Sequence, residues 1–411
     1  QQHIGAPSTP VVKRNDIVKK GQIIAQSAGD GGVPVHSPIY GKVLNVGKAN
    51  HPSMVESQAI VIESLPSPSP KEDGSIETTE MDFSENPNWQ SLDKPAMLEK
   101  IQQAGIVGLG GAAFPTHRKL KLPESAKVDT LVINGAECEP YLTSDHRMML
   151  EMGESILYGT WLMAKIIGVK KALIGIEDNK VDAAENLLKL VTQLKLNIQL
   201  NNLSLWPVDI EVHLTHTRYP QGSEKQLVQA LTGRLIPTRK LPMDVGVVVQ
   251  NVATAAAVYD AIRFGRPLLE RVVTLTGKGI KLPQNFRIPL GTSLDEIVQV
   301  AGGLHENVVK VINGGPMMGR TIPTLEIPVI KGTNGFIFMT SEETYLGGFD
   351  PCIMCGECID VCPLGLEPNR ISILTEAGLP LQTAAYGTHE CFECGSCSYV
   401  CPSKRPLVQF I

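Results

Sequence analysis

The sequence lacks any apolar run long enough to cross a membrane. The longest candidate, ILYGTWLMAKIIGV, is interrupted by Gly159 and Lys165. A membrane-spanning helix needs about 20 predominantly apolar residues. We therefore expect no spanning helix in this chain.

The sequence also lacks an excess of basic charge. It has 37 lysine and arginine residues against 42 aspartate and glutamate residues, and its net charge is -5. Proteins that bind nucleic acid neutralise its phosphates with clustered basic side chains, so we expect no nucleic acid among the partners. With 411 residues, 43% of them hydrophobic, the chain is long enough for several globular domains.

Cysteine is almost absent before residue 352, where Cys138 is the single exception. The other eight cysteines are crowded between residues 352 and 401. Disulfide frameworks are typical of small secreted domains, whereas this chain is long and carries its cysteines at one end. The distribution indicates a reducing compartment and a metal centre.

Two runs near the end share one spacing, CIMCGECIDVCP and CFECGSCSYVCP. Each reads Cys-x2-Cys-x2-Cys-x3-Cys-Pro, the spacing of bacterial two-cluster ferredoxins, in which the fourth cysteine of each run ligates the other cluster. We assign one 4Fe–4S cluster to Cys352, Cys355, Cys358 and Cys401. We assign the second to Cys391, Cys394, Cys397 and Cys362.

Zinc is the alternative for these cysteines. Structural zinc favours two Cys-x2-Cys pairs separated by a spacer and closed into a tetrahedron. Three cysteines at x2 spacing, followed twice by x3-Cys-Pro, fit zinc poorly. Gly356 and Gly395 fit a cluster, because small residues let backbone N–H groups approach its sulfurs. Two adjacent clusters would conduct electrons and need a donor and an acceptor.

The first part of the chain predicts a β module and a connection. Residues 1–65 contain short β-branched runs, and NDIVKKGQ with SPIYGKV resembles a biotinyl/lipoyl-type barrel-sandwich fold. A carrier version needs a lysine at its exposed hairpin, but the turn here reads SAGDGGVP, which indicates a docking or structural module. Residues 66–92 are rich in proline, serine and acidic residues and predict a linker or wrapping segment.

Residues 93–268 alternate between helical patterns and buried-type strands, which predicts a Rossmann-like parallel sheet covered by helices. We expect strands at 130–134, 171–176, 209–215 and 245–251, and helices at 94–104, 145–167, 180–194, 223–233 and 252–265. Residues 269–342 predict a β-grasp-like unit, and residues 343–411 an α-helical, two-cluster ferredoxin-like domain. The fold class is therefore multi-domain α/β.

The stretch GLGGAAFP contains Gly108, Gly110 and Gly111. Alone it is weak support for a binding site, since many such stretches are structural loops. It also fails the dinucleotide fingerprint, because a helix rather than a strand precedes it. If it binds a ligand, its bare backbone N–H groups would approach a phosphate or a flat ring.

Polar residues follow the carboxyl ends of three predicted strands: NGAECEP at 134–140, TRYPQGSEK at 217–225 and QNVATA at 250–255. Ligands of open parallel sheets bind at this edge, where helix N-termini favour phosphate. The carboxylates of this edge would repel phosphate and are expected to meet ribose hydroxyls, an amide or solvent.

We expect Cys138 to be a small buried thiol, and His117 and His146 to make surface or loop hydrogen bonds.

Together, GLGGAAFPTHRK, NGAECEP, the Tyr-x2-Gly-x-Glu pattern at 219–224 and QNVAT resemble the flavin- and NADH-binding subunit of respiratory complex I. With its HIGAP start, the β-grasp-like unit and the two cysteine runs, the whole chain resembles C subunits of Rnf-type ion-translocating NAD:ferredoxin oxidoreductases. Complex I relatives differ at four positions of these motifs: Leu109, Ala136, Ser223 and Ala253.

The resemblance implies one FMN and one NAD(H) site beside the two 4Fe–4S clusters. For the flavin it implies Gly108, Gly110, Gly111 and Lys119 at the phosphate and nucleotide, Asn134 and Glu137 at the flavin, and Asn251 and Thr254 at the phosphate or ribityl chain. For NADH it implies Phe114 stacked on the adenine, with Glu139, Tyr219 and Glu224 lining the nicotinamide pocket and Gly222 among the cofactor-binding residues. In this picture the flavin takes the hydride, so no side chain need act as acid or base.

The resemblance also implies the setting. It predicts a peripheral NADH-oxidising or NAD-reducing subunit on the cytoplasmic face of a bacterial inner membrane, coupled to ion transport by other subunits, one of them an iron–sulfur subunit linking to ferredoxin. Two alternatives remain open. The chain could be an electron-transfer adaptor that uses only its clusters, or a flavoprotein subunit of a soluble hydrogenase or formate dehydrogenase.

Overall fold

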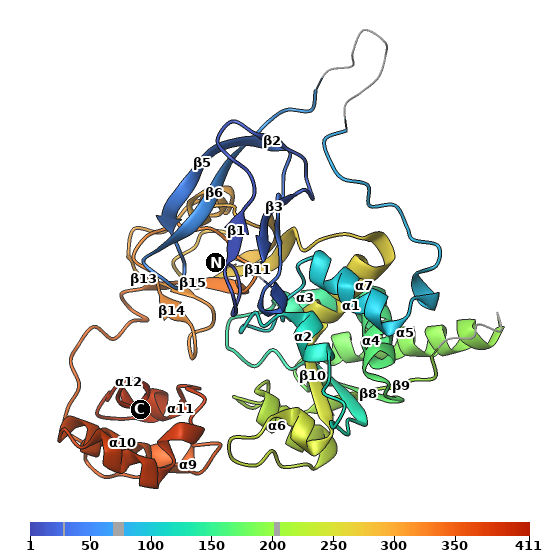
Figure 1. Ribbon diagram of the computed structural model, residues 1–411. Coiled ribbons are helices and arrows are strands. Elements are labelled where there is room, and N and C mark those ends of the chain that lie inside the picture. Colours follow the sequence, from blue (N-terminus) through green and yellow to red (C-terminus); the bar gives the residue numbers. More distant parts are fainter. Residues whose placement is uncertain (28, 69–77, 201–205) are drawn as a thin grey trace.

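The computed structural model describes residues 1–27, 29–68, 78–200 and 206–411 (Figure 1). Its N-terminal module consists of two three-stranded antiparallel sheets. One contains β1 (Ser8–Pro10), β3 (Ile23–Ser27) and β4 (Val35–His36), and the other β2 (Ile17–Val18), β5 (Gly41–Asn50) and β6 (Glu56–Ser64). Val18, Ile24 and Val43 form a small core of its own. The two sheets agree with the expected barrel-sandwich architecture.

The described part of the expected linker wraps onto neighbouring elements. Glu80 forms a parallel bridge with Lys20 of the N-terminal module. Further on, Trp89 is buried and makes edge-to-face contacts with Tyr158 and Tyr259, at ring-centroid distances of 5.6 and 5.5 Å. The segment therefore fastens the first module to the helices of the next one. Residues 69–77 of this expected linker lie outside the described residues.

The central sheet is parallel, with strand order β10-β7-β8-β9. Its strands are β7 (Thr130–Gly135), β8 (Lys171–Glu177), β9 (Asp209–Thr215) and β10 (Val247–Asn251). Helices α1 (Lys94–Gln103) and α2 (Thr116–Leu120) precede the sheet, and α7 (Val252–Phe264) follows it. Between its strands lie α3 (Ser144–Glu151), α4 (Gly153–Ile167), α5 (Val181–Leu200) and α6 (Glu224–Thr232). The order and type of these elements confirm the Rossmann-like expectation.

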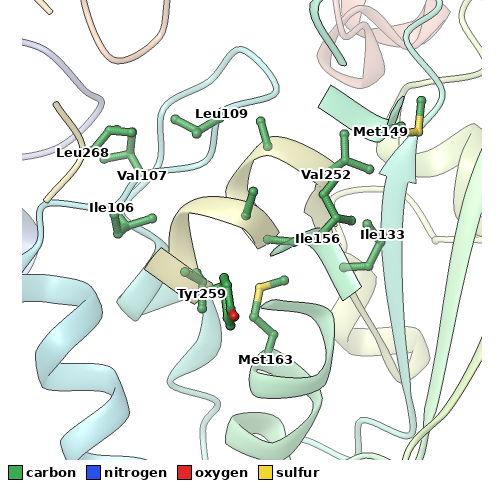
Figure 2. Close-up of a cluster of buried hydrophobic side chains, with 14 of the residues drawn as sticks. Ile106, Val107, Leu109, Ile133, Met149, Ile156, Met163, Val252, Tyr259 and Leu268 are labelled. Carbon is green, nitrogen blue, oxygen red and sulfur yellow. The ribbon is translucent and has the colours of Figure 1, made fainter. Parts of the chain in front are cut away.

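Strand alternation divides the core between the two faces of this sheet. Leu131 and Ile133 of β7 join the large core with helices α1, α3, α4, α5 and α7. Val132 points the other way and packs with Leu227 and Val228 of α6. Figure 2 shows side chains of β7, α3, α4 and α7 gathered in the larger core. Because side chains of a strand alternate between faces, one helix covers one face and several cover the other.

The expected continuous helix at 145–167 is wrong. The structure breaks it at Met152 into α3 and α4. There the Asn186 amide of α5 donates to the carbonyls of Met149 at 3.0 Å and Leu150 at 3.2 Å at the end of α3. Hydrophobic periodicity continued through the break, and only this tertiary contact reveals it.

Helix α4 also approaches α7 unusually closely. A Cβ on Gly159 would lie 1.8 Å from the carbonyl oxygen of Ala255, so the two backbones meet there without a side chain between them. The alanine-rich sequence of α7 permits the same approach from the other side. This contact holds the N-terminus of α7 at the edge of the sheet.

The β-grasp-like unit has a five-stranded mixed sheet with order β12-β11-β15-β13-β14 and one helix. Its elements are β11 (Glu270–Thr276), β12 (Gln284–Pro289), α8 (Leu294–Val300), β13 (Val308–Asn313), β14 (Arg320–Thr321) and β15 (Gly335–Thr340). Phe336 and Phe338 of β15 are fully buried in the large core. The unit therefore packs as an extension of the α/β domain.

The C-terminal domain is small and helical, and it lies beside α6 (Figure 1). It contains α9 (Glu357–Asp360), α10 (Pro368–Glu376), α11 (Ser396–Val400) and α12 (Leu407–Phe410). Short 3-10 helices occur at Gly29–Gly31, Trp89–Ser91, Pro242–Val245, Pro380–Tyr386 and Thr388–Glu390. Within the described ranges, no helix has the length and apolar character needed to cross a membrane.

Candidate functional site

The glycine-rich loop is closed on itself and tied to the start of α7. Gly108 N donates to the carbonyl of Phe114 at 2.8 Å. Leu109 N donates to Thr254 Oγ1 at 2.9 Å. Between these anchors, Gly110 and Gly111 are exposed, and Gly111 has a φ of 126°, which favours glycine. The loop thus presents bare backbone at the carboxyl edge of the sheet.

Thr254 supports this loop instead of facing outward. Its side chain is fully buried, and its hydroxyl accepts the Leu109 N–H. The resemblance implied a contact between this hydroxyl and a phosphate or ribityl chain, whereas here the hydroxyl is turned into the protein. Asn251 is similarly engaged: its side chain caps α7 through Ala253 N at 2.8 Å and donates to Asp145 Oδ2 at 2.6 Å.

The segments that follow β7 and β9 meet at this edge. Asn134 Nδ2 donates to the carbonyl of Gly222 at 2.7 Å, and Gly222 N donates to Cys138 Sγ at 3.2 Å. A Cβ on Gly222 would lie 2.2 Å from the carbonyl oxygen of Ala136, so only glycine allows this approach. Two segments that the sequence placed at the same edge are therefore in direct contact.

Glu137 caps α3. Its carboxylate accepts hydrogen bonds from Ser144 Oγ at 2.9 Å, from Asp145 N at 3.1 Å and from His146 N at 3.2 Å. A carboxylate at a helix N-terminus satisfies N–H groups that have no partner within the helix. With these contacts in place, Glu137 orders the polar segment after β7, and its oxygens are turned toward α3.

Several polar residues of the site escaped the sequence analysis. Asp145 is one: burial, and next the nearby Glu137 carboxylate, raise its pKa, while the Asn251 amide opposes the shift. Lys180 is another, with its Nζ 2.8 Å from Glu177 Oε2, and both side chains are buried. The sequence carried one available clue, because Lys180 follows the carboxyl end of β8 just as the other polar clusters follow their strands.

Arg271 was also missed. It begins the β-grasp-like unit, is buried, and reaches back to the glycine-rich loop. Its Nη2 donates to the carbonyl of Leu109 at 3.0 Å, and its Nε donates to that of Thr333 at 3.0 Å. No local pattern could have indicated a contact across 162 positions.

Charged and aromatic side chains of the expected nucleotide site lie around the loop. Lys119 on α2 forms an ion pair with Glu224 at the start of α6, so two residues 105 positions apart come together. Phe114 is 41% exposed. The Lys119 and Glu224 side chains are partly exposed as well, at 31% and 45%.

Glu139 and Tyr219 make contacts beyond the α/β domain. Glu139 accepts N–H bonds from Met317 at 3.1 Å and Met318 at 2.8 Å, and burial raises its pKa. Tyr219 Oη donates to the carbonyl of Cys394 at 2.6 Å. Both residues therefore connect this edge of the sheet to other units of the chain.

A cavity of about 540 Å³ lies near the loop, between α3, α7 and β11. Leu109, Ala253 and Arg271 line it together with Asp260 and Arg287. None of the thirteen residues expected to bind FMN or NADH is among its lining residues. This cavity was not anticipated from the sequence.

Three minor expectations have different outcomes. His117 is only 3% exposed on α2, so the expected surface or loop position is wrong; α2 packs that side chain inward. His146 lies at the surface as expected, with Nε2 2.8 Å from Asp182 Oδ1. Cys138 is half-buried, and burial raises the pKa of its thiol to about 11.

The two cysteine runs have the same local backbone geometry. Met354 and Glu393, which precede the second cysteine of each run, both have positive φ angles, 59° and 60°. Their N–H groups donate to Cys352 Sγ at 3.4 Å and to Cys391 Sγ at 3.3 Å. These N–H groups would stabilise thiolates bound to iron, so both runs fit a cluster.

The cysteines group as the crossed assignment requires. One small pocket is lined by four of them, Cys352, Cys355, Cys358 and Cys401. In the other group, burial raises the pKa of Cys391, and the nearby thiols of Cys394 and Cys362 add to the shift. The nine cysteines form no disulfide. The fourth cysteine of each run thus lies with the first three of the other.

Four cysteines around one pocket suit a four-iron cluster. Tetrahedral zinc requires its sulfurs about 2.3 Å from a common centre. A 4Fe–4S cluster instead places each thiolate on a different iron, which suits thiols spread around a pocket.

Family models match the chain in four successive segments. Residues 1–65 match the RnfC barrel sandwich hybrid domain, and residues 101–260 match the Nuo51 FMN-binding domain. Residues 272–321 match the SLBB domain, and residues 346–402 match the 4Fe-4S dicluster domain. The order of these matches agrees with the order of modules in the structure.

Solved structures support the architecture. An NAD+-reducing [NiFe]-hydrogenase in its H2-reduced state aligns with a TM-score of 0.55 and 20% identity, covering 75% of this chain and 60% of that chain. The same enzyme type in its air-oxidised state gives a TM-score of 0.54 at 22% identity, over 73% and 55% of the two chains. At this identity the likeness concerns the fold alone.

Curated relatives match over nearly the whole length. The C subunit of the proton-translocating ferredoxin:NAD(+) oxidoreductase complex of Clostridium ljungdahlii is 43% identical over 412 residues, which cover 100% of this chain and 85% of that protein. The C subunit of the Na(+)-translocating complex of Acetobacterium woodii is 43% identical over 370 residues, covering 90% and 79%. The chain therefore belongs to the family of C subunits of ion-translocating ferredoxin:NAD(+) oxidoreductase complexes.

Proposed function

We propose that this chain exchanges electrons between NAD(H), FMN and two 4Fe–4S clusters as a peripheral subunit of a membrane-bound, ion-translocating ferredoxin:NAD+ oxidoreductase complex. The observation that carries the proposal is the order of its modules. An FMN-binding domain match is followed by a dicluster domain match in one chain, and the whole length aligns with the C subunit of such a complex.

The carboxyl edge of the central sheet fits FMN. The exposed backbone of Gly110 and Gly111 offers N–H groups without side-chain cover. The N-terminus of the 13-residue helix α7 lies beside them, and a helix N-terminus favours a phosphate. Lys119, which is ion-paired with Glu224, would add a positive charge if a bound phosphate displaced that carboxylate. Bound FMN would supply two-electron chemistry toward NAD(H) and one-electron chemistry toward the clusters.

The residues behind this surface hold it in shape. Asn134 and Gly222 join the segments after β7 and β9, and Glu137 orders the start of α3. Thr254 and Arg271 fix both sides of the backbone at Leu109. We assign these side chains to positioning of the loop, and we assign direct contact with the flavin to the backbone.

NAD(H) would bind across the same edge. The accessible ring of Phe114 suits stacking with adenine, and Glu224 at the start of α6 suits hydrogen bonds to hydroxyl or amide groups. Glu139 and Tyr219 lie deeper, next to the cluster domain, and would form the nicotinamide end. Side chains here orient the substrate and exclude water, and none is required to transfer a proton.

The iron–sulfur sites follow from the two cysteine groups. Cys352, Cys355, Cys358 and Cys401 would hold one cluster, and Cys391, Cys394, Cys397 and Cys362 the other. The chain would dock on membrane subunits at the cytoplasmic face, where NAD(H) and ferredoxin are available. The N-terminal module, residues 1–65, has no lysine in its SAGDGGVP turn and would serve in docking.

Anaerobic purification of the full chain tests this function. We expect about one FMN and about eight iron atoms per chain, and NADH should bleach the flavin absorbance and elicit cluster EPR signals. Zinc at the cysteines and no flavin would refute the proposal. Intact clusters without flavin would favour the adaptor alternative, in which the α/β domain serves only as a scaffold.

A further inference from the structure

The second cysteine run touches the edge of the sheet where the nicotinamide end of the site is expected. Tyr219 Oη donates to the carbonyl of Cys394 at 2.6 Å. Next to it, a Cβ on Gly395 would lie 2.7 Å from the carbonyl oxygen of Met317, so the loop backbone packs directly against Met317. The loop that carries three cysteines of one cluster is therefore hydrogen-bonded to Tyr219 at this edge and in van der Waals contact with Met317 of the β-grasp-like unit.

Glu139 supports the same contact. Its carboxylate accepts N–H bonds from Met317 at 3.1 Å and from Met318 at 2.8 Å. These bonds fix the backbone on which Gly395 rests. Tyr219 thus reaches the second cysteine run directly, and Glu139 reaches it through one residue.

Two further contacts join α6 to residues next to cysteines of the same group. Lys225 Nζ lies 3.6 Å from Glu390 Oε2, and Glu390 directly precedes Cys391. Gln226 Nε2 donates to the carbonyl of Pro363 at 3.4 Å, and Pro363 directly follows Cys362, the fourth cysteine of that group. The α/β domain therefore contacts both chain segments that carry ligands of this cluster, one beside Cys391 and one beside Cys362.

The first cysteine run faces elsewhere. The pocket around its cysteines is lined only by residues 352–407 of the cluster domain. Cys355 is exposed, and its neighbours Ile353 and Met354 are 67% and 53% exposed. The two runs are alike in local geometry, but these contacts of the α/β domain fall beside Cys362, Cys391 and Cys394, which belong to one group, and none of them falls beside Cys352, Cys355, Cys358 or Cys401.

We propose a fixed order for the two clusters. Electrons pass between the dinucleotide site and the cluster of Cys391, Cys394, Cys397 and Cys362, and they enter or leave the chain at the cluster of Cys352, Cys355, Cys358 and Cys401. Tyr219 and Glu139 are positioning residues that hold the inner cluster's loop against the site. This inference rests on the proposed function and adds to it the sequence of the transfers.

The redox balance is simple. Oxidation of one NADH yields NAD+, one proton and two electrons. The proton is released to water. FMN bound at the site would take the hydride and would pass the two electrons to the inner cluster one at a time. In the isolated chain each of the two clusters can keep one electron, and in the complex a one-electron acceptor of a membrane subunit removes both.

Rapid freeze-quench EPR on the full, cofactor-loaded chain tests the order with two matched variants. Cys355→Ser alters the outer cluster, and NADH should still reduce the inner cluster as fast as in the unaltered chain. Cys394→Ser alters the inner cluster, and NADH should reduce the outer cluster much more slowly, although dithionite reduces it fully. Equal rates in the two variants, or the opposite order, would overturn the proposal.

A second pair of variants keeps all eight cysteines. Tyr219→Phe removes the hydroxyl that bonds Cys394 and should slow reduction of the inner cluster and change its EPR signal, while the outer signal stays unchanged. Tyr345→Phe is the control, because Tyr345 Oη makes a similar bond, 2.8 Å to the Gly348 carbonyl, and Gly348 is not a cysteine. Unchanged inner-cluster kinetics and spectrum in Tyr219→Phe would contradict the positioning role.

Failure of the order and failure of the function look different. If NADH reduces both clusters of the unaltered chain, but reduces the outer cluster before the inner one, only the order is refuted. If NADH reduces neither cluster while dithionite reduces both, the dinucleotide-linked function is refuted and the proposed order with it.

Discussion

Arg271 Nη2 donates to the carbonyl of Leu109 at 3.0 Å and so joins the β-grasp-like unit to the glycine-rich loop of the α/β domain. The same side chain donates through Nε to Thr333, and burial lowers its pKa to about 10. A buried guanidinium with two backbone carbonyls as partners makes the loop conformation depend on a residue of another unit.

Arg271→Met should therefore weaken flavin retention without touching the loop sequence. Two buried carbonyls lose charged donors, which costs on the order of 2–3 kcal/mol. The measurements are flavin content after gel filtration and the midpoint of guanidinium unfolding. Arg266→Met, at a partly exposed arginine, is the control and should leave both unchanged. Full flavin content in Arg271→Met would show that the loop holds its shape alone.

Gly110→Val should abolish flavin retention. A Cβ at this position would already lie 3.3 Å from Asn251 Cβ, and the two methyl groups of valine would cover the backbone N–H groups of the loop. We expect at least tenfold weaker FMN binding, about 1.4 kcal/mol or more, measured by fluorescence titration. Gly348→Val, at a glycine with open space around it, serves as control. Unchanged affinity would move the flavin site away from this loop.

The sequence predicted the central domain well because its strands are short runs of buried β-branched residues between amphipathic helices. Expected strand 171–176 and observed β8 differ by one residue. The break between α3 and α4 was not predictable, because it lies where the Asn186 amide of α5 reaches carbonyls at the end of α3. Periodicity reports which face of a helix is buried, but not how closely a neighbouring helix approaches.

Gly159→Ala should destabilise the α/β domain. Its Cβ would stand 1.8 Å from the Ala255 carbonyl oxygen, so α4 and α7 would have to move apart. Such overpacking costs about 1–3 kcal/mol, occasionally more. Chemical denaturation followed by far-ultraviolet circular dichroism measures the loss. Glu154→Ala on the exposed side of α4 should be close to neutral. A neutral Gly159→Ala would mean that the helices can separate freely.

Cys138 should resist alkylation in the folded protein. Burial raises the pKa of its thiol to about 11, and the thiolate is the reactive form. At pH 8 the thiolate fraction is on the order of a thousandth. Mass spectrometry of the Cys138 peptide after iodoacetamide treatment should show labelling only when guanidinium is added. Rapid labelling of the native chain would place this thiol at an open surface.

His36 should make the protein sensitive to acid. Burial, and next the Lys331 ammonium, lower its pKa from 6.5 to about 3. Between pH 6.5 and about 3, His36 is protonated in the unfolded chain but stays neutral in the folded protein. The free energy of unfolding therefore falls as pH drops from 6.5 toward 3, in total by on the order of 4 kcal/mol.

His36→Gln tests this dependence, because an amide can serve the Gln103 backbone contact without titrating. Its acid-unfolding midpoint should lie at lower pH than that of the unaltered chain, as followed by circular dichroism. His305→Gln, at an exposed histidine, should not shift the midpoint. Equal midpoints for His36→Gln and the unaltered chain would show that another group controls acid unfolding.

The sequence located the candidate site but not its internal support. Glu224 was predictable, because polar residues after parallel strands share an edge, and Lys119 was named only through the resemblance of its motif. Arg271 and Lys331 were not. Lys331 Nζ is buried and donates to the carbonyls of Pro34 at 2.9 Å and Gly105 at 2.7 Å, both far away in the chain. Contacts of this kind depend on how whole units pack, which no local motif encodes.

The three tryptophans of the chain form one connected group. Trp89 and Trp161 stand edge-to-face with ring centroids 6.0 Å apart, and Trp161 Nε1 donates to the carbonyl of Trp206 at 2.9 Å. All three therefore report on a single region, the helices behind the central sheet. Intrinsic fluorescence follows melting of that region, whereas visible absorbance of the iron centres follows the cysteine-rich end, so one sample read at two wavelengths reveals which end of the molecule loses its structure first.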